Sequence, residues 1–250
     1  MTDAHCHVSC GDSSVRELLI GRDFFGVHPW DAVDGTSGTT GTTGTSETSR
    51  ASVPDIQVVP DVSSLAALLP SLRAQLLANP AAGVGEIGLD RLKSREISPR
   101  MREVFEAQLA LALELRRPVV LHGAKCWGQV VTAVCRHLSH SPTPPLPHSP
   151  TPSFLFHGFS RSDGLIPEIV KLNGFISVGP AILNDHAVNY RELVKKIPLD
   201  RLLVETDRTS SSDSLSISDV LAKTADILNL SATELERITD ENTDRFLGVV

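Results

Sequence analysis

Residues 3–7 read Asp3-Ala4-His5-Cys6-His7, and this stretch contains two histidines two positions apart. In a β-strand, residues i and i+2 point to the same face, so Asp3, His5 and His7 would project together. Two imidazoles beside a carboxylate suit zinc or another transition metal. Histidine pairs also occur on ordinary protein surfaces, so a metal site requires further ligands from the rest of the chain.

Length and composition limit the class of protein. The chain has 250 residues, a length that α/β barrels often reach as one domain. Its net charge of −7 argues against a broad basic face for nucleic acid, although metal ions can supply positive charge at a single phosphodiester. Four cysteines without a Cys-x-x-Cys pair indicate free thiols in a reducing compartment. With no signal peptide and no apolar run long enough to cross a bilayer, we expect a cytoplasmic protein with no membrane partner and no obligate protein partner.

Strand-like and helix-like patterns alternate along the chain. Strand patterns occupy residues 24–30, 82–90, 118–122, 153–157, 175–179 and 201–207. Helical patterns occupy residues 64–78, 98–117, 127–138, 165–172, 190–196, 216–228 and 233–247. The apolar segment 15–20 fits either type. Low-complexity stretches at about 35–52 and 139–153 are expected to be exposed inserts in a single domain that spans 1–250.

Polar side chains lie at the ends of the predicted strands. Parallel strands that alternate with helices bring their C-terminal ends to one mouth of a barrel. The residues at these ends are His5, His7, His28, Glu86, His122, His157 and Asp207. Four of these histidines and the two carboxylates exceed the needs of one tetrahedral zinc, but they suit two metal ions bridged by a carboxylate. Two such ions can stabilise the attacking and leaving oxygens of a phosphoryl displacement.

The order of these motifs resembles the TatD family of metal-dependent deoxyribonucleases. The resemblance rests on Asp3-Ala4-His5-Cys6-His7, Gly26-Val27-His28-Pro29, Gly85-Glu86-Ile87-Gly88-Leu89-Asp90, Leu121-His122, Phe156-His157-Gly158-Phe159, Glu205-Thr206-Asp207 and Asn242-Thr243-Asp244-Arg245-Phe246. It implies an α/β fold of the TIM type, a (β/α) barrel, and two divalent metal ions (Zn, Mg or Mn). It also implies hydrolysis of DNA or another phosphodiester by metal-activated water, in the manner of a 3'-5' exonuclease.

The resemblance also assigns a role to each site residue. Glu86 would bridge the two ions, with His5, His7 and Asp207 on one ion and His122 and His157 on the other. Asp207 would orient or deprotonate the water, and Asp207 and Glu86 are therefore the expected catalytic residues. His28 and Lys125 are expected to contact the substrate, Lys125 as a cation for a phosphate.

Supporting roles and alternatives complete the prediction. Asp3 and Asp90 are expected to support ligand histidines, and Glu205 to support Asp207 from one layer below. Only about twenty residues separate residues 3–7 from Gly26-Val27-His28-Pro29, and we interpret the segment that begins at Phe24 as the second strand. One βα unit is therefore expected to be abbreviated, because a full unit takes roughly thirty residues. Two other functions fit the residues: a metal-dependent esterase, such as a D-aminoacyl-tRNA deacylase, and a degenerate barrel that acts as a binding protein.

Overall fold

The computed structural model describes residues 1–32, 64–139 and 152–249. The insert predicted at about 35–52 lies outside these residues, as does nearly all of the one at 139–153. The strands in the described residues are β1 (Thr2–Cys6), β2 (Arg16–Leu19), β3 (Phe24–Phe25), β4 (Gly83–Asp90), β5 (Val119–Ala124), β6 (Phe154–Phe156), β7 (Gly174–Val178) and β8 (Leu202–Val204). The helices are α1 (Leu65–Ala78), α2 (Pro99–Leu115), α3 (Trp127–Ser139), α4 (Ile166–Lys171), α5 (Val188–Val194), α6 (Ile217–Leu228) and α7 (Ala232–Leu247), with short 3-10 turns at Asp163–Leu165, Pro180–Leu183 and Leu199–Arg201.

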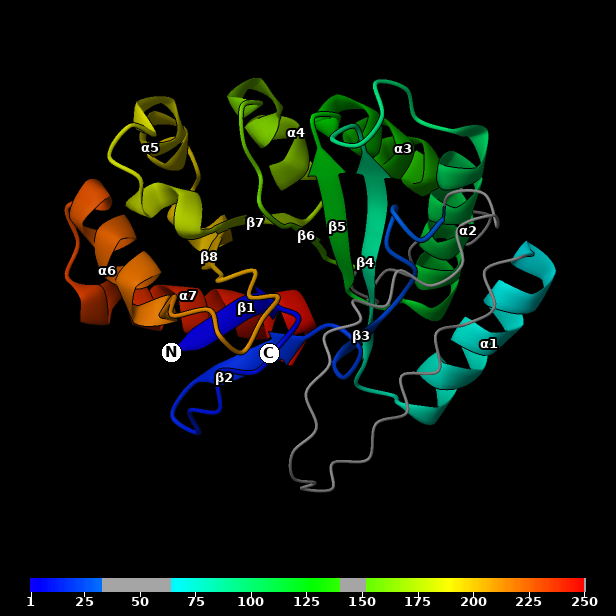
Figure 1. Cartoon of the computed structure of the whole chain (residues 1–250), viewed down its shortest axis with the longest axis horizontal. Helices are drawn as coiled ribbons and strands as arrows, with labels where there is room; N and C mark the ends of the chain where they lie inside the picture. The colour runs from blue at the N-terminus through cyan, green and yellow to red at the C-terminus, as the bar shows by residue number, and fades with distance from the viewer. Residues whose placement is uncertain (33–63, 140–151, 250) are drawn as a thin grey trace.

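The strands follow one another in sequence order around a barrel. Strands β3 to β8 form one parallel sheet, and β1 and β2 form a second parallel pair. The two sheets meet at both edges through isolated contacts. At one edge Ile20 bridges to Phe24, and at the other the amide of Asp207 donates to the carbonyl of His5 at 3.0 Å. This arrangement confirms the α/β barrel class (Figure 1).

The abbreviation of the barrel lies between β1 and β4. The segment 24–30, expected to be the second strand, is the third, and only Phe24–Phe25 has strand structure. The ambiguous segment 15–20 contains the second strand, β2, whose Arg16 pairs with Thr2. Within residues 1–32, no helix joins β1 to β2 or β2 to β3. The shortening therefore affects two connections, and it leaves all eight strands in place.

Capping residues begin the helices where the sequence predicted. The hydroxyl of Ser98 accepts from the amide of Met101 at 3.0 Å, and Pro99 occupies the first turn of α2. In the same way, Ser231 accepts from the amide of Glu234 at 3.1 Å at the start of α7. No helix among the described residues is long and apolar enough to pass through a membrane.

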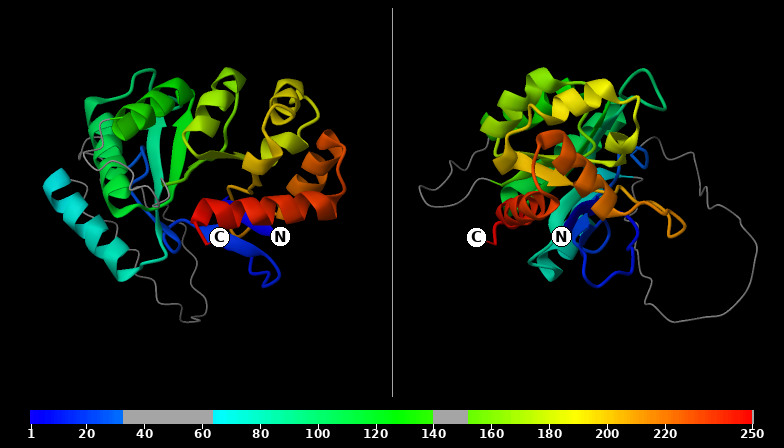
Figure 2. Two further views of the ribbon diagram at one scale, coloured as in Figure 1. Left: turned by 180° about the vertical axis from the view of Figure 1, so that it is seen from behind. Right: turned by 90° about the vertical axis from the view of Figure 1, so that its left-hand side faces the viewer.

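Helix α7 closes the end of the barrel opposite the strand C-termini. Its Phe246 stacks on Phe24 and packs edge-on against Phe175, with ring centroids 5.9 Å apart in both cases. The same cluster contains Val120, Leu155 and Leu203 from β5, β6 and β8. In Figure 2, α7 runs beside β1, and the two termini lie close together. The C-terminal ends of the strands remain available for a site.

Candidate metal centre

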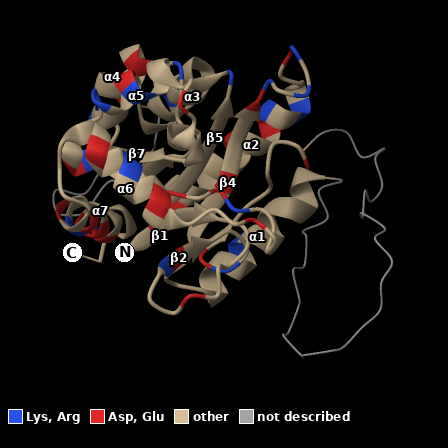
Figure 3. Ribbon diagram, turned by 60° about the vertical axis from the view of Figure 1, so that its left-hand side comes forward, with Lys and Arg blue, Asp and Glu red and all other residues tan. Residues whose placement is uncertain are grey.

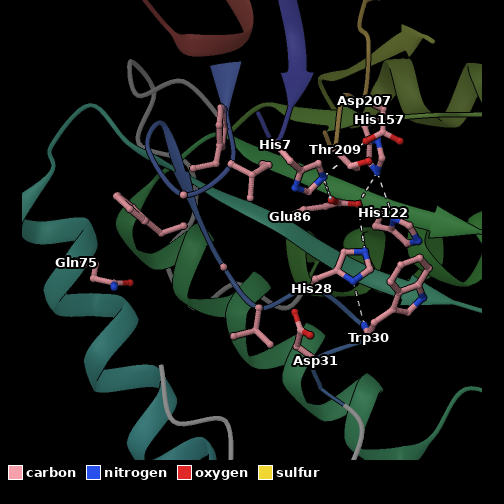
Figure 4. Close-up of a pocket in the computed structure, with 16 residues that line it drawn as sticks. His7, His28, Trp30, Asp31, Gln75, Glu86, His122, His157, Asp207 and Thr209 are labelled. Carbon is pink, nitrogen blue, oxygen red and sulfur yellow. Dashed lines mark hydrogen bonds and ion pairs between the residues drawn. The ribbon is translucent and has the colours of Figure 1, made fainter. Parts of the chain in front are cut away.

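Side chains from five strand ends converge on one point. His5 lies in β1 and His7 directly follows it; Glu86 lies in β4 and His122 in β5. His157 directly follows β6, and Asp207 follows β8 by three residues. Figure 4 shows most of these side chains pointing toward Glu86. The structure therefore brings together all six residues that the sequence suggested as metal ligands.

One oxygen of Glu86 faces the first two histidines. Its Oε2 lies 3.5 Å from His5 Nε2 and 3.3 Å from His7 Nε2. The Oδ1 atom of Asp207 lies 3.4 Å and 3.7 Å from the same two nitrogens. His5, His7 and Asp207 thus form a group of two imidazoles and a carboxylate that could hold one cation.

The other oxygen of Glu86 faces a second group of histidines. Its Oε1 lies 2.5 Å from His122 Nδ1 and 2.6 Å from His157 Nε2. His28, expected to contact substrate, directs its Nε2 toward the same oxygen at 3.6 Å. The carboxylate therefore stands between two sets of nitrogen donors, which is the geometry that a bridging ligand requires.

Backbone crowding explains the glycines around Glu86. A Cβ added at Gly85 would lie 2.7 Å from Cβ of Val120, and one at Gly88 would overlap the carbonyl of His122. Gly88 also has a φ of 153°, which side chains rarely adopt. These glycines let β4 approach β5 closely enough for Glu86 to reach His122. At the other side of the site, Asp207 has a φ of 50°, a left-handed conformation that aspartate tolerates better than most residues.

Three further carboxylates, those of Asp90, Asp3 and Glu205, support the cluster. Asp90 Oδ2 lies 2.7 Å from His122 Nε2, as expected for a residue that orients a ligand. Asp3 accepts from the amide and hydroxyl of Thr206 at 2.9 and 2.6 Å, and so ties β1 to the segment that carries Asp207.

The expectation for Glu205 was wrong. Instead of supporting Asp207, Glu205 accepts from the hydroxyl of Ser177 at 2.5 Å and the amide of Gly158 at 2.7 Å. It also lies 3.6 Å from His157 Nδ1. The reason is that β8 ends at Val204, so the two-residue period of a strand does not extend to Asp207.

The electrostatics of the cluster keep Glu86, Asp90 and Asp207 ionised, whereas burial raises the pKa of Asp3 to about 6. Burial would raise the pKa of Glu86, but the charge of His157 and hydrogen bonding with His122 hold it well below its usual range. Burial and the charge of His157 oppose protonation of His5, yet the carboxylates of Asp207 and Glu86, 3.4 and 3.5 Å from its Nε2, raise its pKa to about 9. For Asp90, burial is outweighed by hydrogen bonds from His122, the Leu92 amide and Trp30, so its pKa is lowered. Proton and metal compete for such sites, so a bound cation would displace the imidazole protons.

Unpartnered nitrogens fit a cation at this position. His5 is fully buried, and neither of its ring nitrogens has a hydrogen-bond partner among the described residues. The same holds for Nδ1 of His157. A buried polar atom without a partner is costly, and a metal ion would satisfy those nitrogens that face Glu86. The donor set of imidazoles and carboxylates therefore fits a divalent cation.

The cluster forms one wall of a pocket of about 530 Å³. Glu86, His7, His122, His157 and Asp207 line it together with His28. The remaining lining residues are Ile20, Gly21, Phe24, Phe25, Gly26, Val27, Trp30, Asp31, Gln75 and Thr209. This volume suits a small ligand or one unit of a larger one.

Two residues lie differently from what the sequence suggested. Lys125 directly follows β5, is exposed and has a φ of 58°, and it is not among the pocket residues. Its contact with a phosphate stays a prediction. Sequence reasoning also missed Trp30, which lies beside His28 in Figure 4. The sequence feature that could have indicated Trp30 is its place two positions after His28, a predicted site residue.

Comparison with known proteins agrees with the site. The family model described as "TatD related DNase" matches residues 21–248. An uncharacterized metal-dependent hydrolase of Bacillus subtilis, YabD, is 27% identical over 175 residues, which cover 66% of this chain and 65% of that protein. The 3'-5' ssDNA/RNA exonuclease TatD of Edwardsiella piscicida is 30% identical over 134 residues, or 53% of this chain and 48% of that protein. The crystal structure of YjjV, a TatD homolog from Escherichia coli K12, matches with a TM-score of 0.59 and 27% identity over 75% of this chain and 72% of that one.

The matched region is shorter than these curated relatives. It spans less than two thirds of the Bacillus protein and about half of the Edwardsiella protein. The activity of the relatives is therefore the starting point for a proposal about this chain.

Proposed function

The chain belongs to the TatD family, and on that premise we propose that it is a divalent-metal-dependent hydrolase that cleaves phosphodiester bonds of single-stranded nucleic acid from an end. The observation that carries this proposal is the convergence of four histidines, from the ends of β1, β5 and β6, on the two oxygens of Glu86, with Asp207 facing two of them. The names of two kinds of relatives, metal-dependent hydrolases and 3'-5' exonucleases, support it.

The proposal places one cation on each side of Glu86. His5, His7 and Asp207 would hold one, and His122 and His157, whose Nδ1 and Nε2 atoms lie 3.2 Å apart, would hold the other. When bound, such ions supply positive charge for the phosphate and lower the pKa of the attacking water. The four imidazoles favour zinc or a similar transition metal over magnesium, which prefers oxygen ligands.

Asp207 is the residue best situated to receive a proton. Its side chain lines the pocket and is 46% exposed, whereas the side chain of Glu86 is 2% exposed. Burial would raise the pKa of Asp207, but the nearby imidazole of His5 and the charge of His157 lower it, so the group is ionised at neutral pH. Its Oδ1 faces His5 and His7, which leaves Oδ2 to accept the proton of the attacking water.

His28 would contact the substrate phosphate. Its Nδ1 accepts from the backbone amide of Trp30 at 3.1 Å, so a neutral ring carries its proton on Nε2. That Nε2 points to the site, 3.6 Å from Glu86, where it can donate to a phosphate oxygen.

The test is a cleavage assay with a matched control. Single-stranded DNA and RNA, labelled at either end, are incubated with wild type, Glu86→Gln and Glu192→Gln in Zn²⁺, Mn²⁺ or Mg²⁺. Glu192 is an exposed glutamate of α5 that pairs with Lys195. We expect shortening from one end in wild type and Glu192→Gln, and a loss of at least a hundredfold in Glu86→Gln. Equal cleavage by Glu86→Gln would refute the proposal. If aminoacyl-tRNA, tested as a second substrate, released its amino acid while its phosphodiesters stayed intact, the bond cleaved would be an ester and not a phosphodiester.

A single domain spanning 1–250 and a cytoplasmic location both stay predictions.

A further inference from the structure

Trp30 is an exposed aromatic side chain at the edge of the candidate metal centre. It is 41% exposed, whereas Trp127, the other tryptophan of the chain, is 4% exposed. A single exposed apolar side chain is common on a protein surface, so the position of Trp30 in the pocket, and not its exposure alone, is what indicates a function. Trp30 lines the same pocket as Glu86 and His122 (Figure 4).

Contacts on two sides fix the indole. Its ring lies edge-on to His28, with centroids 4.9 Å apart and planes at 75°. It is also edge-on to His122, at 6.5 Å and 67°. Since both histidines face Glu86, the indole is held next to the point where a phosphate would bind.

Lys93 covers part of the ring. Its Nζ lies 3.7 Å from the ring centroid, a cation–π contact. Lys93 is not among the residues that line the pocket, whereas Trp30 is. A ligand in the pocket would contact the part of the indole that Lys93 leaves uncovered.

The charge of Lys93 is not neutralised by a carboxylate. Lys171, Lys195 and Lys196 all pair with acidic side chains. Among the described residues, no carboxylate lies within ion-pair distance of Lys93, Lys125 or Lys223, and of these three only Lys93 lies over Trp30. Arg91 and Arg95 lie on the same loop between β4 and α2, where Figure 3 shows blue residues. The loop next to this end of the pocket therefore places positive charge beside an exposed aromatic ring, in a chain of net charge −7.

An aromatic face beside a phosphate site is the chemistry that recognises a nucleotide. Nucleobases stack on aromatic side chains whatever their identity, and only unstacked bases of single strands or frayed ends offer a free face. From this juxtaposition, we infer that Trp30 is the base-stacking platform of the substrate site. The base next to the scissile phosphate lies on the pocket face of the indole, while Lys93 holds the opposite face. The inference rests on the proposed function, and it adds a preference for single strands with little preference for base identity.

The test separates base stacking from phosphate binding. Thymidine 5'-monophosphate and 2-deoxyribose 5-phosphate carry the same phosphate, but only the first has a base, and neither has a phosphodiester to cleave. Their affinities for the Zn²⁺-loaded protein are measured by calorimetry. Tryptophan fluorescence is recorded in parallel, with buried Trp127 as the internal reference.

We expect the nucleotide to bind wild type about tenfold or more tightly than the sugar phosphate and to quench its fluorescence. In Trp30→Leu the two ligands should bind within about twofold of each other, and Trp127 should not be quenched. Trp30→Phe, which keeps an aromatic face, should retain most of the ratio. Circular dichroism checks that the variants are folded.

Two outcomes would overturn the inference in distinguishable ways. If Trp30→Leu keeps the wild-type ratio while Glu86-dependent cleavage of DNA persists, the stacking role is wrong and the proposed function stands. If neither ligand binds wild type and DNA is not cleaved, both proposals fail together.

Discussion

Replacing Asp90 by asparagine tests how the protonation of His122 controls the metal centre. Asp90 uses both of its oxygens: Oδ1 accepts from the amide of Leu92 at 2.5 Å, and Oδ2 faces His122 Nε2 at 2.7 Å. Asparagine has one acceptor oxygen and one NH₂ group, so it cannot accept from both neighbours. Because the Leu92 amide can only donate, the oxygen of the asparagine belongs there and its NH₂ group must face His122.

This orientation reverses the tautomer of His122. An NH₂ group opposite Nε2 makes Nε2 the acceptor, and a neutral ring then carries its proton on Nδ1. Nδ1 is the atom 2.5 Å from Glu86 and the one through which His122 would bind a cation. Loss of a supporting carboxylate typically costs 10- to 100-fold in metal affinity, or about 1.4–2.7 kcal/mol. We expect the upper end of this range, since the binding atom is blocked as well.

The assay is competition for Zn²⁺ against a fluorescent chelator. Asp185→Asn is the matched control, because Asp185 is exposed and its partner is Arg191 at 3.0 Å. That variant should bind Zn²⁺ like wild type. If Asp90→Asn is folded by circular dichroism and binds Zn²⁺ within about threefold of wild type, the tautomer argument is refuted.

Two further perturbations test the fold around the site. Glu17→Gln should destabilise the protein at neutral pH. Burial alone would raise the pKa of Glu17, but hydrogen bonds from Ser9 and the Cys10 amide outweigh burial and bring the pKa below its ordinary value. The ionised Glu17 therefore stabilises the folded protein above the unfolded pKa of about 4.3, and this stabilisation is lost as the pH falls through the lower folded pKa. The urea unfolding midpoints of wild type and Glu17→Gln should therefore converge below about pH 4. A difference between the midpoints that does not change with pH would contradict this. Gly88→Ala should lower the free energy of unfolding by about 2 kcal/mol or more and weaken Zn²⁺ binding, because its Cβ would overlap the carbonyl of His122. Gly128→Ala is the control for that variant, since nothing lies within 4 Å of a Cβ added there, and equal stability of the two proteins would be inconsistent with crowding at Gly88.

The elements that the sequence predicted best are those with local signals. Ser98 and Pro99 begin α2, and Ser231 begins α7, because caps depend on neighbouring residues alone. Strands β2 and β3 have four and two residues, too few for a hydrophobic period to be recognised. These segments are strands because they pair with residues that are distant in the sequence or lie in segments with a weak hydrophobic pattern, as Phe24 pairs with Gly83.

The candidate site could be predicted from one geometric rule about parallel strands, and its details could not. Parallel strands bring their C-terminal ends together, so His122 and His157 could be assigned to one mouth from their positions alone. A second rule, the two-residue period of a strand, failed for Glu205, because the chain leaves the strand before Asp207 and turns through a left-handed conformation. Trp30 lies in a loop after Pro29, where no period relates sequence to direction.

The charge of the pocket explains why its histidines and its tryptophan belong to one mechanism of recognition. None of the described residues that line the pocket is lysine or arginine, and the whole chain carries a net charge of −7. A phosphodiester brought near Glu86 and Asp207 would therefore meet like charge unless cations occupy the nitrogen-lined sides of the carboxylate. Metal ions would thus be required for substrate to bind, before any bond is cleaved. Stacking on Trp30 does not depend on that charge, so it would select a nucleotide from among the other phosphates that the same cations attract.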